Sequence, residues 1–208
     1  MELLLASGNT KKVAELEHLL EPLGVRLLTP AAVGGLPEVI EDEPTFAGNA
    51  RKKAASAARA SGRWSVGDDS GLSVDALDGA PGVHSARWAG RHGDDAANNA
   101  RLLSELAGLE PERRAARFSC ALALARPDGE IESVFEGEVS GRILEEARGT
   151  GGFGYDPLFL FTEPGQPLAG RAFAELSPKE KGAVSHRGRA ISLLVERLRA
   201  LTEVGETS

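Results

Sequence analysis

The sequence carries two adjacent carboxylates inside the apolar stretch Val66-Gly67-Asp68-Asp69-Ser70-Gly71-Leu72-Ser73-Val74. The alternation of apolar residues on either side predicts two short strands that meet at a tight acidic turn. Because neighbouring carboxylates repel each other, their place among apolar residues favours a bound cation, and hard oxygen ligands beside a phosphate suit Mg²⁺. The alternative is an exposed turn, since Asp, Ser and Gly are ordinary turn residues.

The composition is typical of a soluble globular protein. The chain has 208 residues, of which 41% are hydrophobic and 26% charged, enough for one large domain or two lobes that share a core. A net charge of −7 argues against a general nucleic-acid or membrane-surface binder. The one cysteine, Cys120, cannot form an internal disulfide, and no secretory signal or membrane-spanning run is visible, so a cytoplasmic location is expected.

The lysines are clustered in a chain that otherwise uses arginine. They occur only as Lys11-Lys12, Lys52-Lys53 and the pair Lys179 and Lys181. Compact ammonium groups are common phosphate ligands, which makes a phosphorylated substrate one explanation. Chance pairing on solvated helix faces is the other.

The first 28 residues predict a strand–loop–helix–strand unit. A strand at 2–6 and a loop at 7–10 precede a helix at about 11–23, and a second strand follows at 25–28. The loop therefore lies at a helix N-terminus, where free backbone N–H groups and the helix dipole favour an anion. Ser7, Asn9 and Lys12 add side-chain donors.

The remaining elements complete an α/β domain with a mixed sheet. Thr45 is expected to cap the second helix and Gly62 to end it. Further helices are predicted at about 46–60, 94–107 and 183–201, and further strands at 117–125, 131–139 and 158–161.

Two late segments have unusual composition. In Gly151-Gly152-Phe153-Gly154-Tyr155-Asp156-Pro157, the glycines either present Phe153 openly as a platform for a nucleobase or form a hinge beside a core Phe. In Ser185-His186-Arg187-Gly188, Arg187 could donate to O6 and N7 of an oxopurine, a pattern that adenine does not offer. The alternative for this second segment is a first helical turn with a capping Ser and exposed cations.

Six motifs occur in order: Ser7-Gly8-Asn9-x-x-Lys12, Glu41 with Thr45-Phe46-x-x-Asn49-Ala50-x-x-Lys53-Ala54, Asp68-Asp69-Ser70-Gly71-Leu72, Gly79-Ala80-Pro81-Gly82-Val83-x-Ser85-Ala86-Arg87, Gly151 to Pro157, and Ser185-His186-Arg187-Gly188. Together they resemble the inosine/xanthosine triphosphate pyrophosphatases, the RdgB-like non-canonical purine NTP pyrophosphatases. The sequence departs from the pattern of that family in four places. Glu43 stands where Gly is more usual, Gly48 replaces a common acidic residue, Gly67 stands where Ala is usual, and the loop at 163–172 is longer than expected. Asp42 or Glu43 could therefore share the role of Glu41.

The resemblance implies a Mg²⁺-dependent enzyme that hydrolyses ITP, dITP or XTP to the monophosphate and pyrophosphate. It implies a homodimer, with a single domain over residues 1–201 whose elongated mixed sheet has two lobes around an active-site cleft, and a frayed tail at 202–208. Asp69 would be the general base and a metal ligand, Glu41 the second metal ligand, and Asp68 a further candidate. The residues implied to bind substrate, chiefly its phosphates, are Ser7, Gly8, Asn9, Thr10, Lys11, Lys12 and Lys53, with Ser70 as a further contact. The implied base pocket consists of Phe153, Gly154, Tyr155, Asp156, Lys181, His186 and Arg187.

Two other functions stay open at this point. One is a related house-cleaning pyrophosphatase that acts on other modified nucleotides. The other is a nucleotide-binding regulator without turnover, which would need the lysines and Phe153 but not the carboxylates.

Overall fold

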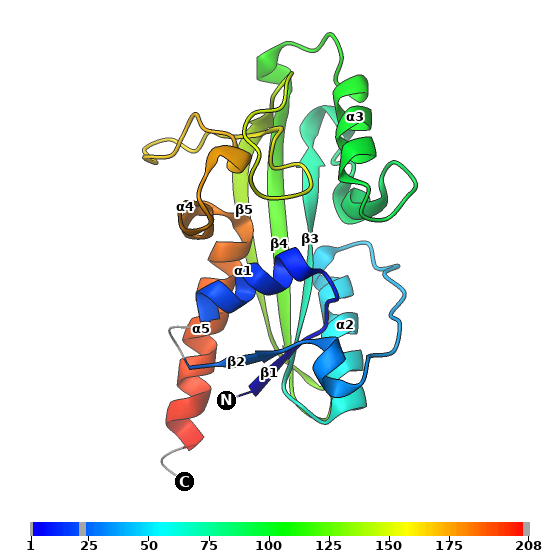
Figure 1. Ribbon diagram of the computed structural model, residues 1–208, viewed down its shortest axis with the longest axis vertical. Helices are drawn as coiled ribbons and strands as arrows, with labels where there is room; N and C mark the ends of the chain where they lie inside the picture. Colours follow the sequence, from blue (N-terminus) through cyan, green and yellow to red (C-terminus); the bar gives the residue numbers. More distant parts are fainter. Residues whose placement is uncertain (1, 21–23, 206–208) are drawn as a thin grey trace. The chain divides into compact units, whose positions relative to one another are not determined.

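The computed structural model describes residues 2–20 and 24–205, and its framework is a six-stranded mixed sheet (Figure 1). The strand order is β2-β1-β3-β4-β5-β6, with β1 parallel to β2 and β3, and β5 antiparallel to β6. The strands are β1 (Glu2–Leu5), β2 (Arg26–Leu28), β3 (Ser65–Val74), β4 (Ala115–Ala125), β5 (Ile131–Ile143) and β6 (Phe159–Phe161). The α-helices are α1 (Thr10–Leu20), α2 (Phe46–Ser61), α3 (Asp95–Glu105), α4 (Pro178–Val184) and α5 (His186–Gly205). The predicted α/β class with a mixed sheet is confirmed.

The chain divides into two compact units, and the first contains Met1–Asp69, Cys120–Gly137 and Arg187–Ser208. Its sheet is covered by helices on both faces because the side chains of β4 alternate. Cys120, Leu122 and Leu124 pack with apolar residues of α1 and α5, whereas Ala121, Ala123 and Ala125 pack against alanines of α2. The small residues on the α2 side allow helix and strand to approach closely.

The second unit contains Ser70–Ser119 and Glu138–His186 and has its own core. Three buried phenylalanines form its centre. The ring centroids of Phe118 and Phe159 are 4.6 Å apart, and those of Phe159 and Phe173 are 4.9 Å apart. Leu102 and Leu106, at the end of α3, pack into the same cluster.

The acidic stretch is one continuous strand, β3, and the predicted turn at 67–71 is wrong. Gly67 explains the misleading signal, because it serves close packing instead of chain reversal. A Cβ atom at Gly67 would lie 2.2 Å from the carbonyl oxygen of Ala50 and 2.7 Å from the backbone nitrogen of Ala54. The missing side chain therefore lets α2 lie directly on β3.

Gly67→Ala is expected to destabilise the protein by at least about 1–3 kcal/mol, since the added methyl group meets helix backbone that cannot rotate away. Thermal unfolding measures the change. Gly8→Ala is a suitable control, because a Cβ atom there would meet nothing within 4 Å. Equal melting temperatures for the two variants would contradict the close approach of α2 to β3.

Several predicted boundaries differ from the structure. The last predicted helix is two helices, α4 and α5, with Ser185 between them in an extended conformation. The helix α5 continues through Gly205, beyond the predicted end at 201, and positions 206–208 of the predicted tail lie outside the described residues. The predicted end of the first helix, 21–23, also lies outside them. Within the described ranges, no helix has the length and apolar character needed to cross a membrane.

Candidate active site

The alternation of β3 sends its two adjacent carboxylates to opposite sides of the strand. Asp68 accepts hydrogen bonds from Lys12 of α1 and Arg187 of α5, whereas Asp69 accepts from Asn49 and Lys53 of α2. This division explains how two neighbouring carboxylates can both be buried without facing each other.

Asp69 and Glu41 share the ammonium group of Lys53. The Nζ atom of Lys53 is 2.9 Å from Oδ1 of Asp69 and 3.1 Å from Oε2 of Glu41. Asn49 lies one helical turn before Lys53 on α2, and its Nδ2 donates to Oδ2 of Asp69 at 3.1 Å. Its Oδ1 accepts from the backbone nitrogen of Glu43 at 3.1 Å. One face of α2 therefore fixes both Asp69 and the segment that carries Glu41.

The two carboxylates differ in basicity. Burial raises the pKa of Asp69 above its ordinary value, and the charge and hydrogen bond of Lys53 offset only part of this effect. Burial acts in the same direction on Glu41, but the charge and hydrogen bonds of Lys53 outweigh it and lower the pKa of that carboxyl group. The surroundings therefore make Asp69 more basic and Glu41 less basic than an ordinary carboxylate of its type, and a raised pKa suits a group that accepts a proton.

The donor set suits a hard divalent cation held by few protein ligands. Oxygens of Glu41 and Asp69 lie within hydrogen-bond distance of the same nitrogen, so a positive charge is already favoured at the point where they converge. The described residues contain no group of three or more His, Cys, Asp or Glu side chains that could hold a metal ion. Mg²⁺ fits such a site because it usually keeps several waters and takes its other ligands from one or two carboxylates and the substrate phosphates.

Asp68 belongs to a buried ion network on the other side of β3. Nε of Arg187 donates to Oδ2 of Asp68 at 2.7 Å, and Nη1 of Arg187 donates to Oε2 of Glu15 at 2.6 Å. Lys12 forms a further ion pair with Asp68. Burial alone would raise the pKa of Asp68, but the charges of Arg187 and Lys12 outweigh it and hold the pKa far below its ordinary value. Asp68 thus carries a permanent charge that anchors α1 and α5 to β3.

The loop before α1 is organised by Asn9. Oδ1 of Asn9 accepts from the backbone nitrogens of Lys11, at 3.0 Å, and Lys12, at 3.3 Å, so Asn9 caps the helix. Oγ of Ser7 in turn accepts from the backbone nitrogen of Asn9 at 3.2 Å. Gly8, Asn9, Thr10 and Lys11 are exposed. The side chain of Asn9 is therefore a helix cap, in addition to any contact that it makes with a ligand.

The Phe153 segment belongs to the second unit and is held by Asp156. Oδ2 of Asp156 accepts from the backbone nitrogen of Phe153 at 2.8 Å and from Nζ of Lys181 at 2.7 Å. The same Nζ atom lies 4.8 Å from the centroid of the Phe153 ring. Phe153 is half-buried and lies outside the aromatic core of the unit. The alternative of a core phenylalanine is therefore wrong.

Two other predicted base-pocket residues are buried. The hydroxyl group of Tyr155 donates to the carbonyl oxygen of Ser85 at 3.0 Å, and its ring packs in the core of the second unit. His186 stacks on Phe118 with ring centroids 4.8 Å apart. Both side chains support their unit, and the predicted exposed cation at His186 is wrong, since only 4% of the residue is exposed.

The departures from the family pattern at positions 43 and 48 compensate each other in space. A Cβ atom at Gly48 would lie 2.7 Å from Cβ of Glu43 and 3.2 Å from its Oε2. The side chain of Glu43 thus fills the space beside Gly48. There it forms an ion pair with Lys52, whose Nζ atom lies 2.7 Å from Oε1 of Glu43. The carboxylate of Glu43 therefore pairs with Lys52, whereas Lys53 pairs with Glu41 and Asp69.

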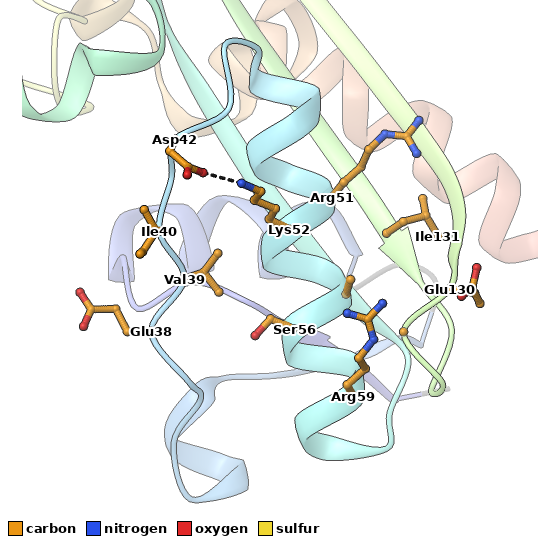
Figure 2. Close-up of a pocket in the computed structure, with 12 residues that line it drawn as sticks. Glu38, Val39, Ile40, Asp42, Arg51, Lys52, Ser56, Arg59, Glu130 and Ile131 are labelled. Atoms are coloured by element: carbon orange, nitrogen blue, oxygen red, sulfur yellow. Dashed lines mark hydrogen bonds and ion pairs between the residues drawn. The ribbon is translucent and has the colours of Figure 1, made fainter.

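A pocket of about 870 Å³ lies along the outer face of α2 (Figure 2). It is lined by the segment that contains Glu38, Val39, Ile40 and Asp42, by α2, and by the turn before β5. Figure 2 shows the ion pair between Lys52 and Asp42 at its rim. Glu41, Lys53 and Asp69 are absent from the residues that line this pocket. The pocket is therefore separate from the site that these three residues form.

A family model described as the Ham1 family matches residues 3–197. The chain belongs to the Ham1 family. The matched residues include all six motifs, and the predicted resemblance is confirmed.

Named Ham1 relatives support the same assignment. The dITP/XTP pyrophosphatase of Mycolicibacterium paratuberculosis is 53% identical over 202 residues, which cover 96% of each chain. A HAM1 protein from Coxiella burnetii superposes with a TM-score of 0.84 at 38% identity, covering 96% of this chain and 99% of the other. The nucleoside-triphosphatase / dITP/XTP pyrophosphatase of Mycobacterium abscessus has a TM-score of 0.73 at 49% identity, covering 93% and 98%.

In this Ham1 chain the structure joins some predicted site residues and gives others new partners. Glu41, Lys53 and Asp69 come together as a group, and Phe153, Asp156 and Lys181 form another. Arg187 contacts Asp68 and Glu15, a partner set that the sequence did not suggest. Ser70 is half-buried at the middle of β3.

Sequence reasoning assigned no role to Asn49 or Glu15. Asn49 was visible as part of the second motif, and its place four residues before Lys53 is the one signal that could have identified it. Glu15 had no such signal, because its partner Arg187 is 172 residues away in the chain.

Proposed function

We propose that this Ham1 protein hydrolyses non-canonical purine nucleoside triphosphates, such as dITP and XTP, to the nucleoside monophosphate and pyrophosphate. The observation that carries the proposal is the shared position of Lys53 between Asp69 and Glu41, at 2.9 and 3.1 Å. A buried base, a second carboxylate and a cation within one small volume are what phosphoanhydride hydrolysis requires. The substrate class comes from the two similar proteins that are named dITP/XTP pyrophosphatases.

Asp69 accepts the proton of the attacking water in this mechanism. Burial raises its pKa and so strengthens it as a base, and the hydrogen bond from Asn49 fixes its orientation. Mg²⁺ bound by Glu41 and Asp69 would neutralise phosphate charge and lower the pKa of water. Lys53 then donates to the phosphate oxygens, while the exposed residues 8–11 at the start of α1 hold the rest of the triphosphate.

The base is bound by the segment around Phe153. We propose that the purine stacks on the ring of Phe153, and that Gly154, Asp156, Lys181 and His186 complete the pocket. Tyr155 and Arg187 have structural partners of their own, Ser85 and Asp68 respectively. Ser70 is a further contact of the substrate. A single two-lobed domain, a homodimeric state and a cytoplasmic location are part of the same proposal.

The test is pyrophosphate release by the purified protein with Mg²⁺. ITP, dITP and XTP should be turned over at least about 10²-fold faster than ATP, because a site that bonds to the polar groups of an oxopurine rejects an analogue that lacks them. They should also be turned over faster than GTP. Equal rates on all five nucleotides would contradict the specificity. Orthophosphate as the first product would contradict the reaction, and faster turnover of other modified nucleotides would favour the related house-cleaning activity.

Removal of divalent cations should abolish turnover and leave the fold intact. With EDTA, two carboxylates and a triphosphate would face each other without the charge that screens them, so the rate should fall by at least about 10²-fold. Added Mg²⁺ should restore it. The melting temperature in EDTA is the control, since Lys53 already screens Glu41 and Asp69 in the free protein. Full activity in EDTA would contradict the metal site.

A further inference from the structure

The backbone of Gly154 is held on both of its polar groups by helix α3. Its N–H donates to Oδ2 of Asp95 at 2.9 Å, and its carbonyl oxygen accepts from Nδ2 of Asn99 at 2.9 Å. Asp95 and Asn99 are four residues apart, so they lie on the same face of α3, one turn after the other. No motif in the sequence drew attention to either residue.

Gly154 has a conformation that requires such support. Its φ of +61° lies in the left-handed region, where neither helix nor strand can pair its N–H and carbonyl groups. The preceding residue is Phe153, whose own N–H donates to Asp156. The backbone of Phe153 is therefore held from both ends, by Asp156 at its own N–H and by Asp95 and Asn99 at the next residue, Gly154.

The side-chain amide of Asn99 uses only its donor group within the described residues. Its Nδ2 bonds to Gly154, whereas its Oδ1 is buried and has no hydrogen-bond partner within the part of the chain that the structure describes. Buried polar atoms are nearly always paired, so a half-satisfied amide carries a cost in stability. That cost points to a role for the bond to Gly154 beyond the stability of α3.

We propose that Asp95 and Asn99 are positioning residues for nucleotide binding, because they fix Gly154 and thereby hold the Phe153 ring in the orientation that stacks on the base. This inference rests on the proposed function. Preorganisation of a binding element lowers the ordering cost that is paid on binding. Its loss therefore affects substrate and transition state alike, which raises KM and leaves kcat unchanged.

The variants Asp95→Ala and Asn99→Ala test the two hydrogen bonds to Gly154 separately. These two are called the clamp variants. Each should raise KM for ITP by about tenfold, within the range of a lost base–aromatic stack, while kcat stays within about twofold. Asp95→Asn keeps an acceptor for the N–H of Gly154 and should restore most of the affinity. Asn99→Asp places a carboxylate oxygen against the carbonyl oxygen of Gly154 and should be worse than Asn99→Ala.

Asp94→Ala is the matched control, because Asp94 caps the same helix and does not touch Gly154. Its Oδ1 accepts from the backbone nitrogen of Ala97 at 3.0 Å. This variant should lower the melting temperature without changing KM. An equal rise of KM in Asp94→Ala would overturn the proposal, since the stability of α3 would then explain the effect.

Hydrogen exchange of the segment 151–157 in the nucleotide-free protein gives a readout independent of turnover. Asp95→Ala should speed exchange there, and Asp94→Ala should not. If the wild-type protein turns over ITP but the clamp variants change neither KM nor exchange, the inference is wrong and the proposed function stands. If the wild-type protein fails to turn over any purine triphosphate, the proposed function is wrong, and exchange alone still decides whether α3 holds Gly154.

Discussion

Asp69→Asn is expected to lower kcat for dITP by about 10²–10⁴-fold, the range that a positioned general base contributes. The substitution keeps the size and shape of the side chain but removes its capacity to accept a proton. The new amide also brings an NH₂ group toward either Lys53 or Asn49, both of which are donors to Asp69 in the native protein. Nucleotide binding should persist, because the lysines and Phe153 are unchanged.

The measurement combines steady-state pyrophosphate release with calorimetric titration of a nucleotide. Asp75→Asn is the control for the loss of one negative charge, since Asp75 follows the same strand and its side chain is 58% exposed. It should leave kcat unchanged. Undiminished turnover in Asp69→Asn would remove Asp69 from the mechanism, and loss of nucleotide binding would show that its charge acts on the ground state instead.

Arg187→Met should cost about 3–5 kcal/mol of folding stability, because it leaves the buried carboxylate of Asp68 without its principal partner. For a chain of this length, that corresponds to a fall in melting temperature of roughly 10 °C. The double variant Asp68→Asn/Arg187→Met should recover part of the loss, since the uncompensated charge is then gone. Thermal and denaturant unfolding measure the stability of the wild-type protein and of both variants.

Arg26→Met provides the comparison for an exposed ion pair. Arg26 pairs with Glu2 at 3.1 Å, but 75% of its side chain is exposed, so its loss should cost under about 1 kcal/mol. If Arg187 only read the edge of an oxopurine, Arg187→Met would melt like the wild-type protein and lose discrimination between ITP and ATP. An unchanged melting temperature would thus contradict the anchoring role that the structure gives to this arginine.

Local chemistry predicted α2 and β4 well. Thr45 accepts from the backbone nitrogen of Gly48 and Gly62 adopts φ +64°, as their residue types indicated for the two ends of the helix. The alternation from Phe118 to Leu124 predicted the strand correctly, but as a half-buried one, whereas residues 120–125 are buried on both faces of the sheet. Residue type misled at β3, because Gly67 and the two aspartates are turn residues by type. Gly67 and Asp69 contact α2, and Asp68 contacts α1 and α5, so all three lie in a strand between helices.

The candidate site was predictable in its membership more than in its partners. The resemblance named Glu41, Lys53 and Asp69, and the structure joins them through one ammonium group. It also named Arg187, but the bond to Asp68 could not be read from spacing. A charged side chain pairs with whichever partner the folded backbone brings near it. When the pair is buried, breaking it would leave an unpaired buried charge, which is energetically costly.

The sequence by itself determined the helix caps, the alternation of the strands, the α/β class and the family, because each depends on residues close together in the chain or on a pattern along it. Only the tertiary structure decided that Asp68 and Asp69 serve different sides of β3. It joined Asp68 to Lys12 across 56 positions and to Arg187 across 119. Such contacts depend on the path of the whole backbone, whereas propensity and periodicity act over a few residues.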